Sequence, residues 1–458
     1  MNLCIRNART WRGEPVDIAI AEGVIAGTGR GLRRRGAEFD AEGATVLPGL
    51  HDHHFHIMAT AARRSSIDLS SCRDGQAVQD AIARASASQQ PGAWLRAVDY
   101  DERAAGLPDR AILDGWAPAH RLRVQDRTGA LWVLNGSALE TLTGLGEWPE
   151  GAERDGAGDL TGRFWREDAW LGERLPRALP DLAGFGRELA AMGLTGLTDA
   201  GARNGPEQAA LLAGAVSQRL TIMGDETLRP GGGFALGPLK LLIDERDPPD
   251  LDRLADRIRV AREQRRAVAA HCVTATELAL YLCALELAGG AQPGDRIEHG
   301  GMIPDAAIAA IRATPLTVVT NPGFIRDRGD RYLETIAQGD RSELYRARSL
   351  LVAGIPLAAG SDAPYATADP WIAMRAARDR RTAGGHPLGQ DERIPAERAL
   401  RLYLGSANDP GGPPRCIAAG EAADLILCEG PAEAILADLC ADRVRATVVA
   451  GDVVFNRA

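Results

Sequence analysis

The stretch Gly237-Pro238-Leu239-Lys240-Leu241-Leu242-Ile243-Asp244 has the apolar composition of a buried β-strand, and it holds the only lysine of the 458-residue chain. All other members of the 53 Lys and Arg residues are arginine. Arginine stays protonated in proteins, whereas a buried lysine can lose its proton and act as a nucleophile. Reaction of its amine with CO2 would give a carbamate, an oxygen ligand able to bridge two metal ions. The alternative is an incidental lysine whose stem packs against apolar neighbours.

Short apolar segments of the same kind recur along the chain, separated by stretches of helical periodicity such as 251–266 and 306–313. Segments that are apolar on both faces are typical of parallel strands covered by helices. The strands that we expect are residues 45–56, 196–199, 220–223, 239–244, 267–271, 296–299, 316–320 and 355–359. These eight β/α units predict an α/β fold of the (β/α)8, or TIM, barrel type.

The two ends of the chain have a different pattern, in which short alternating strands are separated by tight turns. This pattern predicts a small β-sandwich domain built from both termini, residues 1–47 and 405–458, around a barrel of residues 48–404. Residues of about 57–185 do not fit the repeat and contain extra strand-like pieces at 94–98 and 122–125. We interpret them as an insertion after the first barrel strand that covers the active site.

The composition narrows the class of protein. Hydrophobic residues make up 45% of the chain and charged residues 25%, and the formal charge is −9, which argues against a nucleic-acid or anionic-membrane partner. Seven scattered cysteines without a Cys-x-x-Cys pair predict reduced thiols, and the sequence has no apolar run of membrane-spanning length. We therefore expect a cytoplasmic protein that acts on a small-molecule substrate, and a homo-oligomer is compatible with the sequence.

Side chains that commonly bind metals follow several of the expected barrel strands. In Asp52-His53-His54-Phe55-His56 the period of two places His54 and His56 on one strand face, where two imidazoles can chelate a divalent ion. An isolated His-x-His pair on a strand more often has a structural role. Three further residues of metal-binding type lie at or just past the ends of later strands: His271, His299 and Asp362. Because carboxyl ends of barrel strands meet at one mouth, these residues and Lys240 predict a metal site there.

Here the sequence resembles a known family. Leu47-Pro48-Gly49-Leu50-His51-Asp52-His53-His54-Phe55-His56 is similar to the PGxxDxHxH opening of the amidohydrolase superfamily. Lys240, His271, His299 and the segment Gly360-Ser361-Asp362-Ala363-Pro364 match the later ligand positions in order. The long insertion and residues 193–201 resemble the branch of the N-substituted formamide deformylases, amidohydrolase family 3.

The resemblance implies a divalent metal, with zinc as the expected ion, and two ions if Lys240 is carboxylated. The ligands it implies are His54, His56 and Asp362 for the first ion, His271 and His299 for the second, and carboxylated Lys240 as the bridge. The implied reaction is hydrolysis of an amide, N-acyl or cyclic amide C–N bond by a metal-activated hydroxide. Asp362 would take the proton of the nucleophile and pass it to the leaving nitrogen.

Substrate contacts and alternative functions remain open. Arg326 and Arg328 could hold a substrate carboxylate and Tyr365 could contact the substrate, whereas a solvated loop and simple packing are the alternatives. One alternative function is an aminohydrolase that deaminates a small heterocycle, although Thr274 lies where the resemblance would then require glutamate. The other is a non-catalytic amidohydrolase-like binding protein, although such relatives typically lose ligands that this chain retains.

Overall fold

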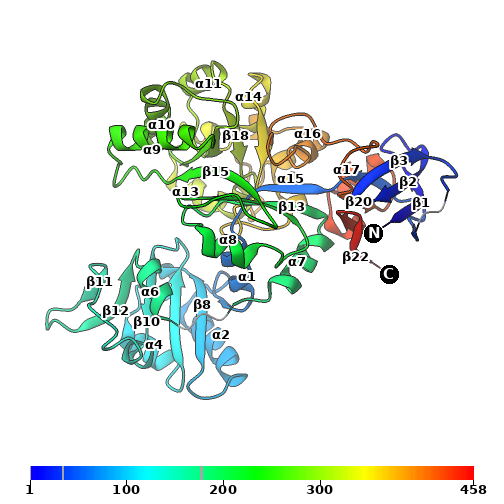
Figure 1. Cartoon of the computed structure of the whole chain (residues 1–458). Coiled ribbons are helices and arrows are strands. Elements are labelled where there is room, and N and C mark those ends of the chain that lie inside the picture. Colours follow the sequence, from blue (N-terminus) through cyan, green and yellow to red (C-terminus); the bar gives the residue numbers. More distant parts are fainter. Residues whose placement is uncertain (1, 34–35, 176–178, 458) are drawn as a thin grey trace. The chain divides into compact units, whose positions relative to one another are not determined.

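The computed structural model describes residues 2–33, 36–175 and 179–457 (Figure 1). The chain forms two compact units, one made of Met1–Ile57 with Leu182–Ala458 and the other of Met58–Asp181. The first unit contains a parallel barrel and a small β domain, and the second contains a sheet of its own. No helix among the described residues is long and apolar enough to cross a membrane.

The barrel is a sheet of eight strands, and every neighbouring pair along it is parallel. In sheet order the strands are β6 (Leu50–Phe55), β13 (Leu194–Asp199), β14 (Arg219–Gly224), β15 (Ala235–Leu241), β16 (Val268–Cys272), β17 (Arg296–His299), β18 (Thr317–Thr320) and β19 (Leu357–Ala359). Most of their residues are buried, as the apolar segments predicted. The expected (β/α)8 fold is confirmed.

The helices of the barrel unit occupy most of the connections between strands. They are α7 (Leu182–Ala191), α8 (Pro206–Leu212), α9 (Leu251–Glu263), α10 (Ala275–Leu287), α11 (Asp305–Arg312), α12 (Gly323–Asp327), α13 (Gly329–Thr335), α14 (Ala347–Val352), α15 (Pro370–Asp379) and α16 (Ala396–Arg401). One connection lacks a helix, because the described residues 225–234 join β14 to β15 without one. Helix α10 begins where Thr274 and Glu277 form a reciprocal capping box.

The barrel closes where the segment after β19 meets β6. The backbone N–H of Asp362 donates to the carbonyl of His54 over 2.8 Å, and the N–H of His56 donates to the carbonyl of Ala363 over 3.0 Å. The buried carboxylate of Asp52 adds a third connection, because it accepts the N–H of Ser361 over 3.0 Å. These bonds hold the end of the eighth strand in a fixed register against the first.

The small β domain predicted from the two termini is present, and in Figure 1 both ends of the chain lie in it. Its strands are β1 (Leu3–Arg9), β2 (Pro15–Ala21), β3 (Val24–Gly29), β4 (Ala37–Asp40), β5 (Thr45–Pro48), β20 (Leu425–Cys428), β21 (Val444–Val449) and β22 (Asp452–Asn456). Buried side chains from both ends, including Ile5, Ile18, Leu425 and Val448, form one core between them.

The first expected barrel strand, residues 45–56, is in fact two strands. Thr45–Pro48 pairs with β20 in the terminal domain, and only Leu50–Phe55 belongs to the barrel. The change takes place at Gly49, where an added Cβ would lie 2.2 Å from the side chain of Thr195. The apolar run continues through this point, so the pattern of side chains does not reveal the change of sheet.

The second unit is built on a six-stranded sheet. Along the sheet its strands are β11 (Ala152–Arg154), β12 (Leu160–Trp165), β10 (Leu131–Leu134), β9 (Arg121–Asp126), β8 (Trp94–Tyr100) and β7 (Ile67–Asp68). Both strand-like pieces predicted in the insertion are therefore present, as β8 and β9. One core joins them to helices α2 (Gly75–Ala87) and α4 (Arg110–Trp116). That this unit covers the active site stays a prediction.

We expect Gly360→Ala to destabilise the barrel, because the new Cβ would lie 2.4 Å from the backbone nitrogen of His54 at the closure. Overpacking of this kind costs about 1–3 kcal/mol. The midpoint of thermal unfolding should fall. The control is Gly27→Ala in β3, where an added Cβ meets no atom within 4 Å. An equal midpoint for both variants would contradict the tight closure.

Candidate metal centre

Three ligand-type side chains meet at the closure of the barrel. The ligand atoms of His54, His56 and Asp362 all lie within 4.8 Å of one another, and among the described residues they are the group able to hold a metal ion. Oδ1 of Asp362 is 3.0 Å from Nε2 of His56 and 3.4 Å from Nε2 of His54. The closure bonds therefore place the carboxylate between the two imidazoles.

Two residues at this mouth have a backbone conformation that is rare for non-glycine residues. His299 has φ = 70° and Asp362 has φ = 56°. Such conformations are costly and cluster at functional sites, where the surrounding structure enforces them. His299 is the last residue of β17, and Asp362 lies three residues after the end of β19, so the left-handed conformation sets the direction of each side chain where the chain leaves the barrel wall. We infer that these two backbone conformations lower the stability of the fold and are kept because they set the direction of the two side chains.

The two later histidines extend the group. The ring of His299 lies 4.6 Å from the rings of both His54 and His271, measured between ring centres. Nδ1 of His299 is 2.8 Å from Oδ1 of Asn321, and the amide nitrogen of Asn321 donates to the carbonyl of Gly360 over 2.9 Å. The amide orientation leaves Oδ1 as acceptor, so Nδ1 of His299 carries the proton and Nε2 keeps a lone pair for a metal.

The buried ion pair of Arg296 and Glu298 orients the ring of His54. Its Nδ1 is in close contact with the carboxylate of Glu298, which is fully buried. Glu298 in turn accepts a hydrogen bond from Nε of Arg296 over 2.7 Å, and Arg296 also donates to the carbonyl of His53 over 2.6 Å. This chain fixes the ring of His54 and directs its Nε2 toward Asp362. Carboxylate partners of this kind are typical of metal-bound histidines.

Lys240 is buried inside the barrel wall, on β15, with 2% of its surface exposed. Its Nζ has no hydrogen-bond partner in the part of the chain that the structure describes. Burial lowers the pKa of the amine, although the carboxylates of Glu298 and Asp362 oppose this shift. A buried cation without a hydrogen bond is costly, so this amine fits a residue that is modified or that serves a ligand.

The charges of the site favour a bound cation. Burial would raise the pKa of Asp362, but His299, His54 and His56 together lower it well below its usual range. Burial, followed by Lys240, lowers the pKa of His271 to about 4, so this imidazole is neutral near pH 7. Burial lowers the pKa of His299 well below its usual range. Burial and the charge of Lys240 would also lower the pKa of His54, but the carboxylates of Glu298 and Asp362 outweigh them and raise it. A carboxylate grouped with imidazoles is a donor set that a divalent ion such as zinc prefers.

The three predicted substrate contacts do not form one cluster. Arg326 pairs with its neighbour Asp327 over 2.6 Å. Arg328 lies over the ring of Phe324 and donates to the carbonyl of Tyr365 over 3.3 Å. The ring of Tyr365 is 5.8 Å from that of His56, so of the three side chains it is the one placed against the metal-type group. Contact of any of them with substrate stays a prediction.

Glu298 and Asn321 were not singled out from the sequence. A signal for the first was available, because Arg296 and Glu298 put two charges at a spacing of two into a short strand that is expected to be buried. Buried charges with this spacing share a strand face and must find partners. Asn321 gave no such signal, because an asparagine after a strand is common in turns.

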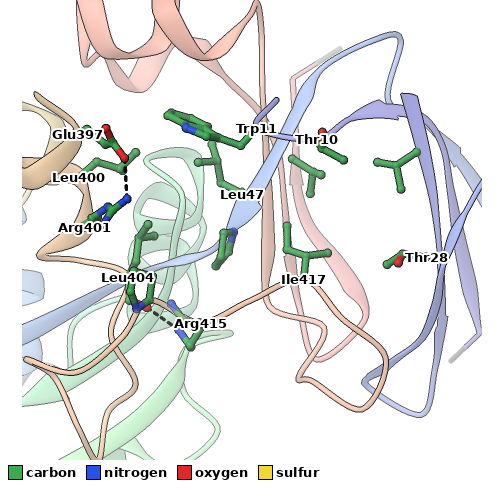
Figure 2. A pocket seen from close by; sticks show the side chains of 14 residues that line it. Thr10, Trp11, Thr28, Leu47, Glu397, Leu400, Arg401, Leu404, Arg415 and Ile417 are labelled. Carbon is green, nitrogen blue, oxygen red and sulfur yellow. Dashed lines mark hydrogen bonds and ion pairs between the residues drawn. The ribbon is translucent and has the colours of Figure 1, made fainter. Parts of the chain in front are cut away.

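A separate apolar cavity of about 470 Å³ lies between the small β domain and α16 (Figure 2). Its lining includes Trp11, Leu47, Leu404 and Ile417. Leu47 precedes the first barrel strand, so the cavity lies toward the end of β6 that is opposite His54. None of the ligand-type residues described above lines it, and for this reason the histidine group remains the candidate functional site.

The histidine and aspartate side chains lie at the carboxyl ends of the parallel strands, where barrel enzymes have their active sites. A family model described as "Amidohydrolase family" matches residues 37–455. The chain therefore belongs to the amidohydrolase family. The expectation of an enzyme of this family is confirmed.

Individual relatives are distant and align over nearly their full length. The chain is 26% identical to an N-substituted formamide deformylase of Arthrobacter pascens, covering 96% of this chain and 95% of the relative. It is 23% identical to the putative amidohydrolase YtcJ of Bacillus subtilis, covering 96% of each. A crystal structure of an uncharacterized metal-dependent hydrolase from Pyrococcus horikoshii matches with a TM-score of 0.76 and 17% identity, over 94% of this chain and 98% of that one, which supports the fold.

We expect Glu298→Gln to weaken metal binding, because an amide cannot hold the Nδ1–H of His54 as a carboxylate does. Loss of such a partner costs about ten- to hundredfold in affinity. The dissociation constant would be measured by competition with a chelator, alongside the midpoint of thermal unfolding. Glu286→Gln, at an exposed position of α10, is the control. Unchanged affinity in a folded Glu298→Gln protein would contradict the role given to this carboxylate.

Proposed function

We propose that this protein is a metal-dependent hydrolase that cleaves a C–N bond of a small-molecule amide, N-acyl compound or cyclic amide. The observation that carries the proposal is the meeting of His54, His56 and Asp362 beside a buried lysine amine without a hydrogen bond. The amidohydrolase family supports the reaction class. The similarity to a formamide deformylase supports an N-substituted amide as the substrate class.

The meeting of His54, His56 and Asp362 supports a divalent ion at the mouth, with zinc the expected one. In the two-ion assignment these three residues would hold one ion, His271 and His299 would hold the other, and Lys240 would serve as a ligand through its carbamate. Bound there, divalent ions lower the pKa of water and polarise a carbonyl group. The neutral imidazoles of His271 and His299 suit this assignment, because only an unprotonated nitrogen can bind a metal.

Lys240 is suited to carboxylation by its surroundings. The reaction requires the neutral amine, and burial favours that form by lowering the pKa of Lys240. The nitrogen then forms a bond to the carbon of CO2 and releases one proton, and the carbamate carries one negative charge. An anionic oxygen ligand is a better neighbour for a pair of cations than an ammonium group would be.

Asp362 is suited to proton transfer during the reaction. Its carboxylate is ionised near pH 7, because His299, His54 and His56 outweigh burial and lower its pKa. It is also fixed in direction by the closure bond from its backbone N–H to His54. An ionised and oriented carboxylate can accept a proton from the attacking water and deliver it to the leaving nitrogen.

The alternative of a heterocycle deaminase has less support. Thr274, which lies three residues after His271, is the N-cap of α10, and its hydroxyl accepts the N–H of Glu277. The carboxylate of Glu277 is 4.0 Å from His271 but already accepts the N–H groups of Val273 and Thr274. The position is therefore occupied by a helix cap rather than by a free acid.

Metal content and substrate choice test the proposed function directly. The purified protein should contain about two equivalents of divalent metal and hydrolyse members of a panel of formamides, N-acyl amino acids, lactams and imides. Removal of the metal with a chelator should abolish turnover, and added zinc should restore it. About one equivalent of metal with release of ammonia from an amino-heterocycle would favour the deaminase instead. A metal-free protein without turnover would favour a binding role.

Lys240→Arg should lose the bridging ligand and most activity although it keeps a positive charge, because a guanidinium forms no carbamate under these conditions. Since the chain has one lysine, ¹³C-labelled bicarbonate should give one slowly exchanging carbamate signal in NMR spectra of the native protein. That signal should be absent from the variant, whose metal content should fall. Near-normal turnover and metal content in Lys240→Arg would make the lysine incidental.

A further inference from the structure

Two arginines lie side by side on one face of the sheet in the second unit. Arg96 of β8 pairs directly with Arg123 of β9 in the parallel register, so their side chains project from the same face. Their guanidinium carbons lie 5.3 and 5.2 Å from the ring centre of Trp132 on the adjacent strand β10. The indole N–H of Trp132 donates to Asp168 over 2.8 Å, which fixes the ring. Both guanidiniums therefore rest on a buried aromatic platform.

No carboxylate of the described residues forms an ion pair with either arginine of this pair. The side chain of Arg123 makes no hydrogen bond or ion pair with any residue in the described ranges, apart from its contact with the indole. Arg96 makes one hydrogen bond, to the hydroxyl of Ser66 over 2.6 Å. The carboxylates of Asp168 and Asp99 act on Arg96 from a distance, but Asp168 accepts the indole N–H of Trp132 and Asp99 is paired with Arg63. Two adjacent cations thus keep most of their N–H donors available.

Partial burial makes this arrangement costly. Burial lowers the pKa of Arg123, and no neighbouring carboxylate offsets the shift. Burial, and then the charge of Arg123, lowers the pKa of Arg96 to about 10. Half-buried charges are normally paired, because water no longer solvates them fully. An anion supplied from outside the chain would remove the cost.

We propose that Arg96 and Arg123 form a binding site for a small organic molecule that carries a carboxylate. The planar guanidinium fork matches the two oxygens of a carboxylate, and two forks on neighbouring strands can bind it together. Trp94, two residues before Arg96 and on the same strand face, is partly exposed and supplies apolar surface for the organic part. None of these residues is a proposed metal ligand.

Calorimetric titration of the full chain with benzoate and with benzamide tests the site. Benzoate should bind, and benzamide, which has the same shape without the charge, should bind about tenfold more weakly or not at all. Arg123→Gln and Arg96→Gln should each weaken benzoate binding by about tenfold or more. Arg154→Gln is the control, because it removes the same charge from the exposed end of β11 in the same unit.

Two further measurements separate binding from structure and identify the source of the carboxylate. The midpoint of thermal unfolding should not fall in Arg123→Gln, since this side chain has no polar partner to lose. If Arg123→Gln raises the KM for amides that carry a carboxylate and leaves the KM for uncharged amides unchanged, the ligand of this site is the substrate. If Arg123→Gln weakens benzoate binding and changes neither KM, the ligand is a separate molecule. Equal binding of benzoate and benzamide, no binding of benzoate, or full binding by Arg123→Gln would overturn the proposal.

Discussion

The closure of the barrel is the constraint on which the candidate site depends. The backbone bond from Asp362 to His54 joins the eighth strand to the first, and the next bond, from His56 to Ala363, fixes the same register. A parallel barrel must close somewhere, and here the two edges that close it carry the carboxylate and the two imidazoles. The geometry of these ligands is therefore set by backbone hydrogen bonds rather than by flexible side chains. A shift of register would separate the three ligands and open the barrel at the same time.

The interior of the barrel contains buried charges near this closure, and stability alone does not explain them. Glu298 and Arg296 are almost completely buried, and an ion pair in such a place is often no more stable than apolar side chains of equal volume. The pair gains a purpose from its contact with His54, because it fixes the tautomer and direction of that ring. Together with the left-handed backbone of His299 and Asp362, it indicates that the interior sacrifices stability to orient the residues at the mouth.

Elements with strong local signals could be predicted from the sequence. Buried parallel strands appear as short apolar runs, and residues that follow them must share one end of the barrel. The strands and the meeting of ligand-type residues at one mouth therefore followed from order along the chain, whereas the set of His54, His56 and Asp362 came from the resemblance to a family. Features that depend on distant partners could not be predicted. The change of sheet at Gly49 depends on close contact with Thr195, and the direction of His299 depends on Asn321.

The use of arginine and lysine inside the barrel unit separates structural from chemical roles. Arg380 is buried, and its guanidinium donates to the carbonyls of Leu344, Tyr345, Leu388 and Gly389. Arg266 likewise donates to four backbone carbonyls. Buried arginines of this type link loops, and their donors are satisfied. The one lysine is buried without any hydrogen bond to its amine among the described residues. If this position required only a positive charge, we would expect an arginine with hydrogen-bonded N–H groups, as at Arg266 and Arg380. The unbonded lysine therefore supports a chemical role for its amine.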